Sequence, residues 1–135
     1  GLGQESISAI EASDEVLVVT NPNLPAVTDA LKTVDIAEET GTQVTGVILN
    51  KIKDHDSELS KEEVESMIGY EVMMEIPDHQ KVEEALAKKK PVVHHEPDHH
   101  VAERFNVIAS DVAGIEYEPQ LGGKGIISRL LEKFT

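Results

Sequence analysis

The segment 43–51, Gln-Val-Thr-Gly-Val-Ile-Leu-Asn-Lys, most constrains what this chain folds into. Its apolar core is mostly β-branched, and turn-forming or charged residues bound it on both sides. Such a run is typical of a strand buried on both faces of a parallel sheet. It ends on Asn50, and ligands of open α/β sheets bind outside the carboxyl ends of the strands. The Asn50 carboxamide offers a donor and an acceptor, which suits a purine edge, but Asn also commonly just turns the chain. From this strand alone both interpretations stay open.

Similar runs alternate with helical periodicity along most of the chain. We expect strands at 15–20, 43–50 and 70–76, with a short edge strand at 91–93. The helices between them show apolar residues at i, i+3, i+4 and i+7, and Ser60 and Glu63 form a capping-box pattern. We also expect Asp98 to cap the helix that follows the short strand. This alternation predicts an α/β fold: a parallel sheet flanked by helices on both faces, with right-handed crossovers.

Composition excludes several functional classes. The 135 residues suffice for one core, and the net charge of −14 argues against binding to a nucleic-acid backbone. Aromatic residues make up 3% and Trp is absent, so a base-stacking platform is not expected. The chain has no Cys, which removes disulfides, thiolate metal sites and a Cys nucleophile. No apolar run is long enough to span a membrane, and no signal peptide opens the chain, so we expect a cytoplasmic protein.

Three of the expected strands end in residues that are typical of loops: Thr20-Asn21-Pro22, Asn50-Lys51 and Pro77-Asp78. Parallel strands end on the same side of a sheet, so these segments together could line a pocket for a nucleotide base. The sequence contains no glycine-rich loop with Lys and Ser/Thr that would cradle phosphates. Residues 122–125, Gly-Gly-Lys-Gly, lack both the preceding strand and the following hydroxyl. No nucleophilic triad or catalytic carboxylate pair is recognisable.

The order and spacing of these segments resemble the carboxyl-terminal half of the MinD-like septum-site-determining ATPases, in the ParA/MinD family of deviant-Walker P-loop proteins. No single segment is decisive, and the resemblance covers essentially all 135 residues. It rests on residues 1–3, 13–22, 46–51, 76–78 and 91–93, together with the terminal amphipathic segment.

The resemblance implies a partial parallel P-loop NTPase-type sheet and a nucleotide site. Asn50 and the Pro77-Asp78 turn would hold adenine, with ATP and Mg²⁺ bound in the intact protein. The family's phosphate-binding loop, switch I and Walker B aspartate would all precede residue 1. We therefore expect no catalytic residue in this chain, no tightly bound nucleotide and no ATPase activity of the chain alone. The family's phosphate-loop strand would pair beside strand 15–20, so we expect that strand to be an open edge here.

The resemblance also implies a domain plan and partners. Residues 1–114 would be the carboxyl-terminal half of the ATPase domain, residues 115–124 a linker, and residues 125–135 an amphipathic membrane-targeting helix. The implied partners are a second copy in the ATP state, an anionic membrane at the inner face of the cell membrane, and a division-regulator protein. No nucleic acid is expected.

The terminal segment carries its own signal. At 100° per residue its five apolar side chains fall within an arc of roughly 140°, and cations flank them. Such a stripe is equally what a helix folded back on a core would show, but the preceding linker and the cations favour a membrane surface. The expected membrane-binding residues are Ile126, Ile127, Leu130, Leu131 and Phe134.

The segment His94–His100 holds four histidines and two acidic residues, which suit zinc or nickel. Its spacing matches no closed metal-site pattern, so we interpret it as a solvated loop with no specific metal. The main alternative for the whole chain is a ParA-like or Mrp-like partition or iron–sulfur carrier ATPase without a membrane role. A non-enzymatic regulatory domain that binds partners without nucleotide is a third possibility.

Overall fold

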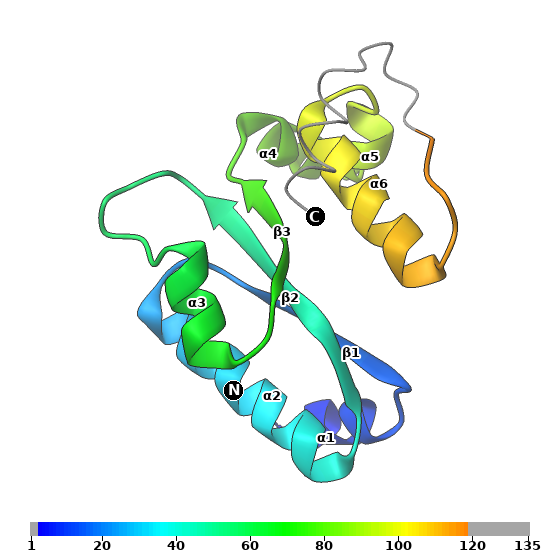
Figure 1. Ribbon diagram of the computed structural model, residues 1–135. Coiled ribbons are helices and arrows are strands. Elements are labelled where there is room, and N and C mark those ends of the chain that lie inside the picture. The colour runs from blue at the N-terminus through cyan, green and yellow to red at the C-terminus, as the bar shows by residue number, and fades with distance from the viewer. Residues whose placement is uncertain (1–2, 119–135) are drawn as a thin grey trace. The chain divides into compact units, whose positions relative to one another are not determined.

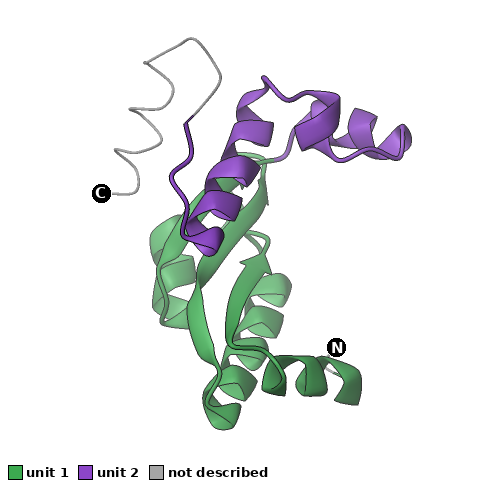
Figure 2. Cartoon of the chain, turned by 90° about the vertical axis from the view of Figure 1, so that its right-hand side faces the viewer, with its two compact units in different colours: residues 1–77 green, residues 78–135 purple. Residues whose placement is uncertain are grey.

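The computed structural model describes residues 3–118 of the chain. These residues form two compact units, which Figure 2 colours separately. We call residues 1–77 the sheet unit and residues 78–135 the helical unit, of which residues 78–118 are described. The membrane-binding residues expected at 126–134 lie outside the described residues.

The sheet unit alternates helices and strands, as the sequence predicts (Figure 1). Its three strands are parallel, in the order β1-β2-β3, which confirms the expected α/β class. Within residues 3–118, β1 pairs with β2 alone, so its other edge is open, as expected. The elements are α1 (Gln4–Glu11), β1 (Glu15–Thr20), α2 (Leu24–Thr40), β2 (Gln43–Ile52), α3 (Lys61–Ile68) and β3 (Val72–Pro77).

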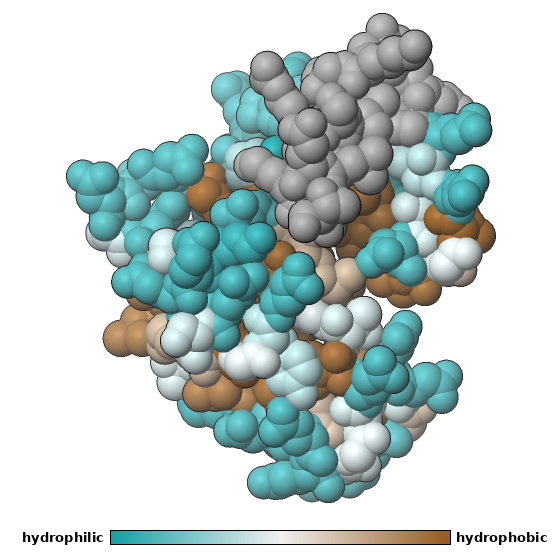
Figure 3. Space-filling model, viewed as in Figure 1, coloured by the Kyte–Doolittle hydropathy of each residue, from teal (hydrophilic) through white to brown (hydrophobic). Residues whose placement is uncertain are grey.

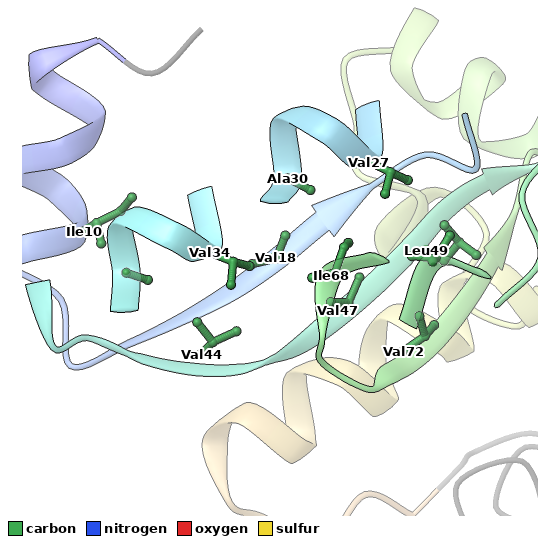
Figure 4. Close-up of a cluster of buried hydrophobic side chains, with 12 residues drawn as sticks. Ile10, Val18, Val27, Ala30, Val34, Val44, Val47, Leu49, Ile68 and Val72 are labelled. Atoms are coloured by element: carbon green, nitrogen blue, oxygen red, sulfur yellow. The ribbon is translucent and has the colours of Figure 1, made fainter. Parts of the chain in front are cut away.

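A single apolar cluster holds the sheet unit together, with contributions from its three helices and three strands. In Figure 4, Val34 of α2 lies beside Val18 of β1 and Val44 of β2, while Leu49 and Val72 extend the cluster across the sheet. Val34 and Leu49 are each only 1% exposed. Burying such a side chain contributes roughly 1.5–3 kcal/mol, so this cluster is the main source of the unit's stability.

Capping residues fix the helix ends where the sequence places them. The Asn23 side chain accepts a hydrogen bond from the Ala26 N–H (2.9 Å) at the start of α2. Ser60 and Glu63 form the predicted capping box of α3, with bonds of 3.2 and 2.7 Å. Gly41 ends α2 at φ +75°, a backbone conformation that glycine adopts without steric cost. Local chemistry therefore sets these element boundaries.

The helical unit contains α4 (Gln80–Ala87), α5 (Val92–His95) and α6 (His100–Ala113). The strand expected at 91–93 is wrong, because the chain there forms the short helix α5. The Pro91 carbonyl accepts hydrogen bonds from the N–H groups of His94 and His95, both at 3.0 Å, which closes a helical turn. The expected cap at Asp98 is also wrong, because His99 caps α6 through its ring nitrogen (3.2 Å). The β-branched pair Val92-Val93 favours a strand by propensity, but the local turn prevails.

Hydrophilic residues cover much of the face shown in Figure 3, as the 28% of charged residues leads one to expect. No helix within residues 3–118 is both long and apolar enough to cross a membrane.

Candidate functional site at the carboxyl edge of the sheet

Asn50 lies in β2 at an irregular point of the sheet. Leu49 pairs with Glu75 and Ile52 pairs with Pro77, so two residues of β2 oppose one residue of β3 between these pairs. This is a β-bulge, and bulges commonly re-aim side chains beside functional sites. The bulge therefore breaks the regular alternation of side chains just where the sequence predicts a ligand.

Lys51, which lies in this bulge, has an unusual backbone conformation. Its φ is +57°, in the left-handed region that residues other than glycine seldom adopt. Such a conformation costs about 1–3 kcal/mol and persists only where surrounding structure imposes it. Strain of this kind is enriched at ligand sites. The backbone of Lys51 therefore supports a ligand site here independently of the Asn50 side chain.

The structure brings two of the three predicted nucleotide residues to neighbouring strands. Asn50 is partly exposed, and within residues 3–118 its carboxamide has no hydrogen-bond partner. Pro77 ends β3 opposite Ile52, two residues beyond Asn50. Asp78 follows Pro77 directly and opens the helical unit. The carboxamide is thus available to a ligand at the end of β2.

The loop after β2 is organised by one carboxylate that the sequence analysis overlooked. Glu58 accepts hydrogen bonds from the backbone N–H of Lys53 (2.9 and 3.2 Å) and of His55 (3.4 Å). The Leu59 N–H then donates to the Pro22 carbonyl (3.0 Å), which joins this loop to the loop after β1. Residues 54–58 were predicted as a polar loop, and an acidic side chain that closes such a loop has no distinctive sequence signal.

A cavity of about 320 Å³ opens between these loops, and residues from the carboxyl ends of β2 and β3 line it together with Pro22 of the loop after β1. Its lining includes four carboxylates, those of Asp54, Glu58, Glu62 and Glu75, against one cation, Lys61. Asn50, Pro77 and Asp78 are not among the lining residues. Because like charges repel, this cavity does not suit the phosphates of a nucleotide.

A second cavity, of about 390 Å³, runs along β1 and the first half of α2. Its lining includes the strand residues 17–20 together with Asp29 and Thr33. Val19, on this strand, is 59% exposed, which is unusual for a β-branched residue in a sheet. The open edge of β1 is therefore bordered by unfilled space.

A parallel sheet with helices packed on it, and polar residues at its carboxyl edge, is the α/β arrangement that P-loop NTPases share with other nucleotide-binding folds. Residues 7–85 match the AAA domain family (AAA_26), and the chain belongs to this family. An uncharacterized ATP-binding protein of Methanocaldococcus jannaschii is 33% identical over 124 residues, which covers 92% of this chain and 47% of that protein.

Solved structures agree with this assignment. MinD of Pyrococcus horikoshii, determined in complex with Mg-ADP, has a TM-score of 0.76 and 25% identity, covering 83% of this chain and 46% of that one. MinD of Aquifex aeolicus, in a complex with MinC, also gives 0.76 at 21% identity, covering 91% of this chain and 52% of that one. The fold is that of the ParA/MinD-like ATPases. The chain spans about half the length of the relatives it matches.

Proposed function

We propose that this chain is the carboxyl-terminal portion of a MinD-like ATPase and supplies the base-binding part of its nucleotide site. The observation that carries the proposal is the bulge at Asn50 and Lys51, which presents at the carboxyl edge of β2, beside Pro77, a carboxamide that has no partner among residues 3–118. Adenine has a donor and an acceptor on adjacent atoms of one edge, and a carboxamide pairs with both.

The residues present fit the adenine base but not the rest of the nucleotide. Asn50, Pro77 and Asp78 would hold the base, the first through hydrogen bonds and the other two as the turn that borders it. The neighbouring cavity is rich in carboxylates, and the sequence contains no phosphate-binding loop. In the whole protein Mg²⁺ would neutralise the phosphates, and the residues that hold both would lie outside this chain.

The open edge of β1 supports the view that more of the ATPase completes this sheet. The strand is apolar, its edge is unpaired within residues 3–118, and a cavity borders it. An apolar strand edge left in water is a template for pairing with another strand. In the proposed whole protein a further parallel strand pairs there.

We further propose that residues 125–135 attach the whole protein to the inner face of the cell membrane and that nucleotide-dependent dimerisation controls this attachment. The support is in the sequence: five apolar residues at helical spacing, flanked by the cations Lys124, Arg129 and Lys133. A division-regulator protein would then be recruited to the membrane with it, which is the kind of complex that the Aquifex aeolicus structure contains.

Substitution of Asn50 tests the base site in the full-length protein. Asn50→Ala should weaken ATP binding by roughly 1–3 kcal/mol, because the base edge loses its partners. Asn50→Asp keeps the shape and one acceptor but loses the donor, so it should weaken binding similarly. Asn106→Ala, which removes a carboxamide from α6, is the matched control and should leave the affinity unchanged. Unchanged ATP affinity in both Asn50 variants would refute the site.

The alternative is a ParA-like or Mrp-like ATPase without a membrane role. It shares the nucleotide site, so the Asn50 experiment does not separate the two. Binding to lipid vesicles does, because only the MinD-like function needs the apolar stripe of the terminal segment.

A further inference from the structure

Three histidine rings meet in the helical unit, although they come from positions twenty residues apart. His79 precedes α4, whereas His99 and His100 begin α6. The ring centroids of His79 and His99 are 4.3 Å apart, those of His99 and His100 are 4.2 Å apart, and those of His79 and His100 are 5.4 Å apart. One ring nitrogen from each histidine lies within 4.8 Å of the other two.

We propose that His79, His99 and His100 form a binding site for a divalent transition-metal ion of the Zn²⁺ class. Three imidazole ligands with a fourth position left to water is a common coordination set for zinc. The histidine segment 94–100 by itself lacks the spacing of a metal site, and the fold supplies the missing ligand by bringing His79 to it. Nothing in the proposed nucleotide function requires this cluster.

The three histidine rings are all partly buried. Burial, together with the neighbouring His79 ring, lowers the pKa of His99, and burial together with His99 lowers the pKa of His100. Neutral imidazole is the form of the side chain that binds a metal ion.

The hydrogen bonds by which His79 and His99 cap α4 and α6 compete with metal binding. Nδ1 of His79 accepts a hydrogen bond from the Lys81 N–H (3.1 Å), and Nδ1 of His99 accepts one from the Val101 N–H (3.2 Å). A neutral ring that accepts at Nδ1 carries its proton on Nε2. Coordination through Nε2 moves that proton to Nδ1 and breaks the capping bond. Metal binding therefore exchanges two capping bonds for metal–nitrogen bonds.

Charges near the site determine which ions it selects. Lys81, Arg104 and the amino-terminal ends of α4 and α6 repel cations, while Glu96 and the net charge of −14 attract them. Mg²⁺ and Ca²⁺ prefer oxygen ligands and gain little from imidazole. Zn²⁺, Ni²⁺ and Cu²⁺ bind imidazole strongly enough to overcome the repulsion. The site should therefore take transition metals and exclude Mg²⁺.

A neighbouring group of possible ligands serves as a contrast. Glu84, His95 and Glu96 also converge, but the Lys81 ammonium lies 3.2 Å from Glu84 and 3.0 Å from Glu96. The ammonium pairs with both carboxylates and so competes with a metal ion for them. His95 is for that reason a matched control: it lies in the same unit and outside the three-histidine cluster.

The experiment is calorimetric titration of the 135-residue chain with Zn²⁺. His79→Asn and His99→Asn remove an imidazole but keep a side chain that caps helices well, so the fold is retained. We expect one Zn²⁺ per chain, and a dissociation constant at least ten-fold higher in either variant. His95→Asn and His55→Asn should change it less than two-fold, and Mg²⁺ should give no heat of binding. Circular dichroism checks that each variant is folded.

An NMR titration gives a second, independent readout. Because Zn²⁺ takes both rings out of their capping role, the backbone amides of Lys81 and Val101 should shift most on binding. Several weak sites that respond equally to His55→Asn would mean adventitious binding only and would overturn the proposal. One tight site that is unaffected by both His79→Asn and His99→Asn would also overturn it.

Discussion

The backbone N–H of Leu59 donates a hydrogen bond of 3.0 Å to the carbonyl of Pro22, which ties the loop after β2 to the loop after β1. Glu58, the residue before it, holds the same loop closed from the other side through the amides of Lys53 and His55. Both loops border the carboxyl edge of the sheet. This edge is therefore organised by contacts within the chain itself, before any ligand binds.

Replacing Glu58 should loosen this edge. A carboxylate that accepts backbone hydrogen bonds contributes about 1.5–3 kcal/mol when buried, and partial exposure reduces this. We expect Glu58→Ala to lower the free energy of unfolding by about 1 kcal/mol and to speed amide exchange at Lys53. Asp56→Ala, in the same loop and exposed, is the control. Equal protection of the Lys53 amide in both variants would show that Glu58 does not organise the loop.

Sequence patterns predicted the sheet unit closely because its signals are local. The capping box at Ser60 and Glu63 appears in the structure as written in the sequence. The strand predicted at 91–93 was wrong because two β-branched residues are only a weak indication of a strand. The helical turn there forms its own backbone hydrogen bonds and is therefore preferred.

The site was less predictable than the fold. Asn50 itself is visible in the sequence. The bulge beside it depends on the register between β2 and β3, and no single residue indicates that register. The meeting of His79 with His99 depends on the packing of α4, α5 and α6. Such juxtapositions arise from tertiary structure and have no local pattern.

The ion pair between Lys81 and Glu96 makes a prediction about acid stability. Lys81 lowers the pKa of Glu96 below its ordinary value of 4.5. A carboxyl group whose pKa falls on folding stabilises the folded state above pH 4.5 and loses that contribution as the pH falls through the lowered value. Wild type should therefore unfold at a higher temperature than Glu96→Gln at pH 7, and the difference should shrink as the pH falls below 4.5 and through the lowered pKa. A difference that stays undiminished throughout an acid titration would contradict this account.

The open edge of β1 should make the chain self-associate. Val19 is 59% exposed on that strand, and a charged residue on a strand edge opposes pairing with another chain. We expect sedimentation velocity to show concentration-dependent dimers or larger species, and Val19→Lys to shift the population toward monomer. Leu86→Lys is the control, because Leu86 is 75% exposed but belongs to the helix α4 and not to a strand. A wild-type chain that stays monomeric at all concentrations would show that the edge is protected.

The terminal segment gives the test that separates the two classes of ATPase. Burying its five apolar side chains at about 25 cal/mol per Å² contributes a few kcal/mol, while ordering ten residues costs a comparable amount. The net charge of −14 also repels an anionic surface, although the segment itself is cationic on balance. One copy should therefore bind marginally, whereas two copies on a dimer bind well, because the second insertion is intramolecular. In the proposed whole protein, dimerisation would therefore control membrane attachment. We expect the full-length protein to co-sediment with anionic vesicles only with ATP, and Ile127→Glu or Leu130→Glu to abolish co-sedimentation without changing ATP affinity.

Ser128→Glu is the control for this experiment, because it adds the same charge on the polar face and should weaken binding much less. If both apolar-face variants sediment with vesicles as wild type does, the segment is not the anchor, and an ATPase without a membrane role becomes the better description.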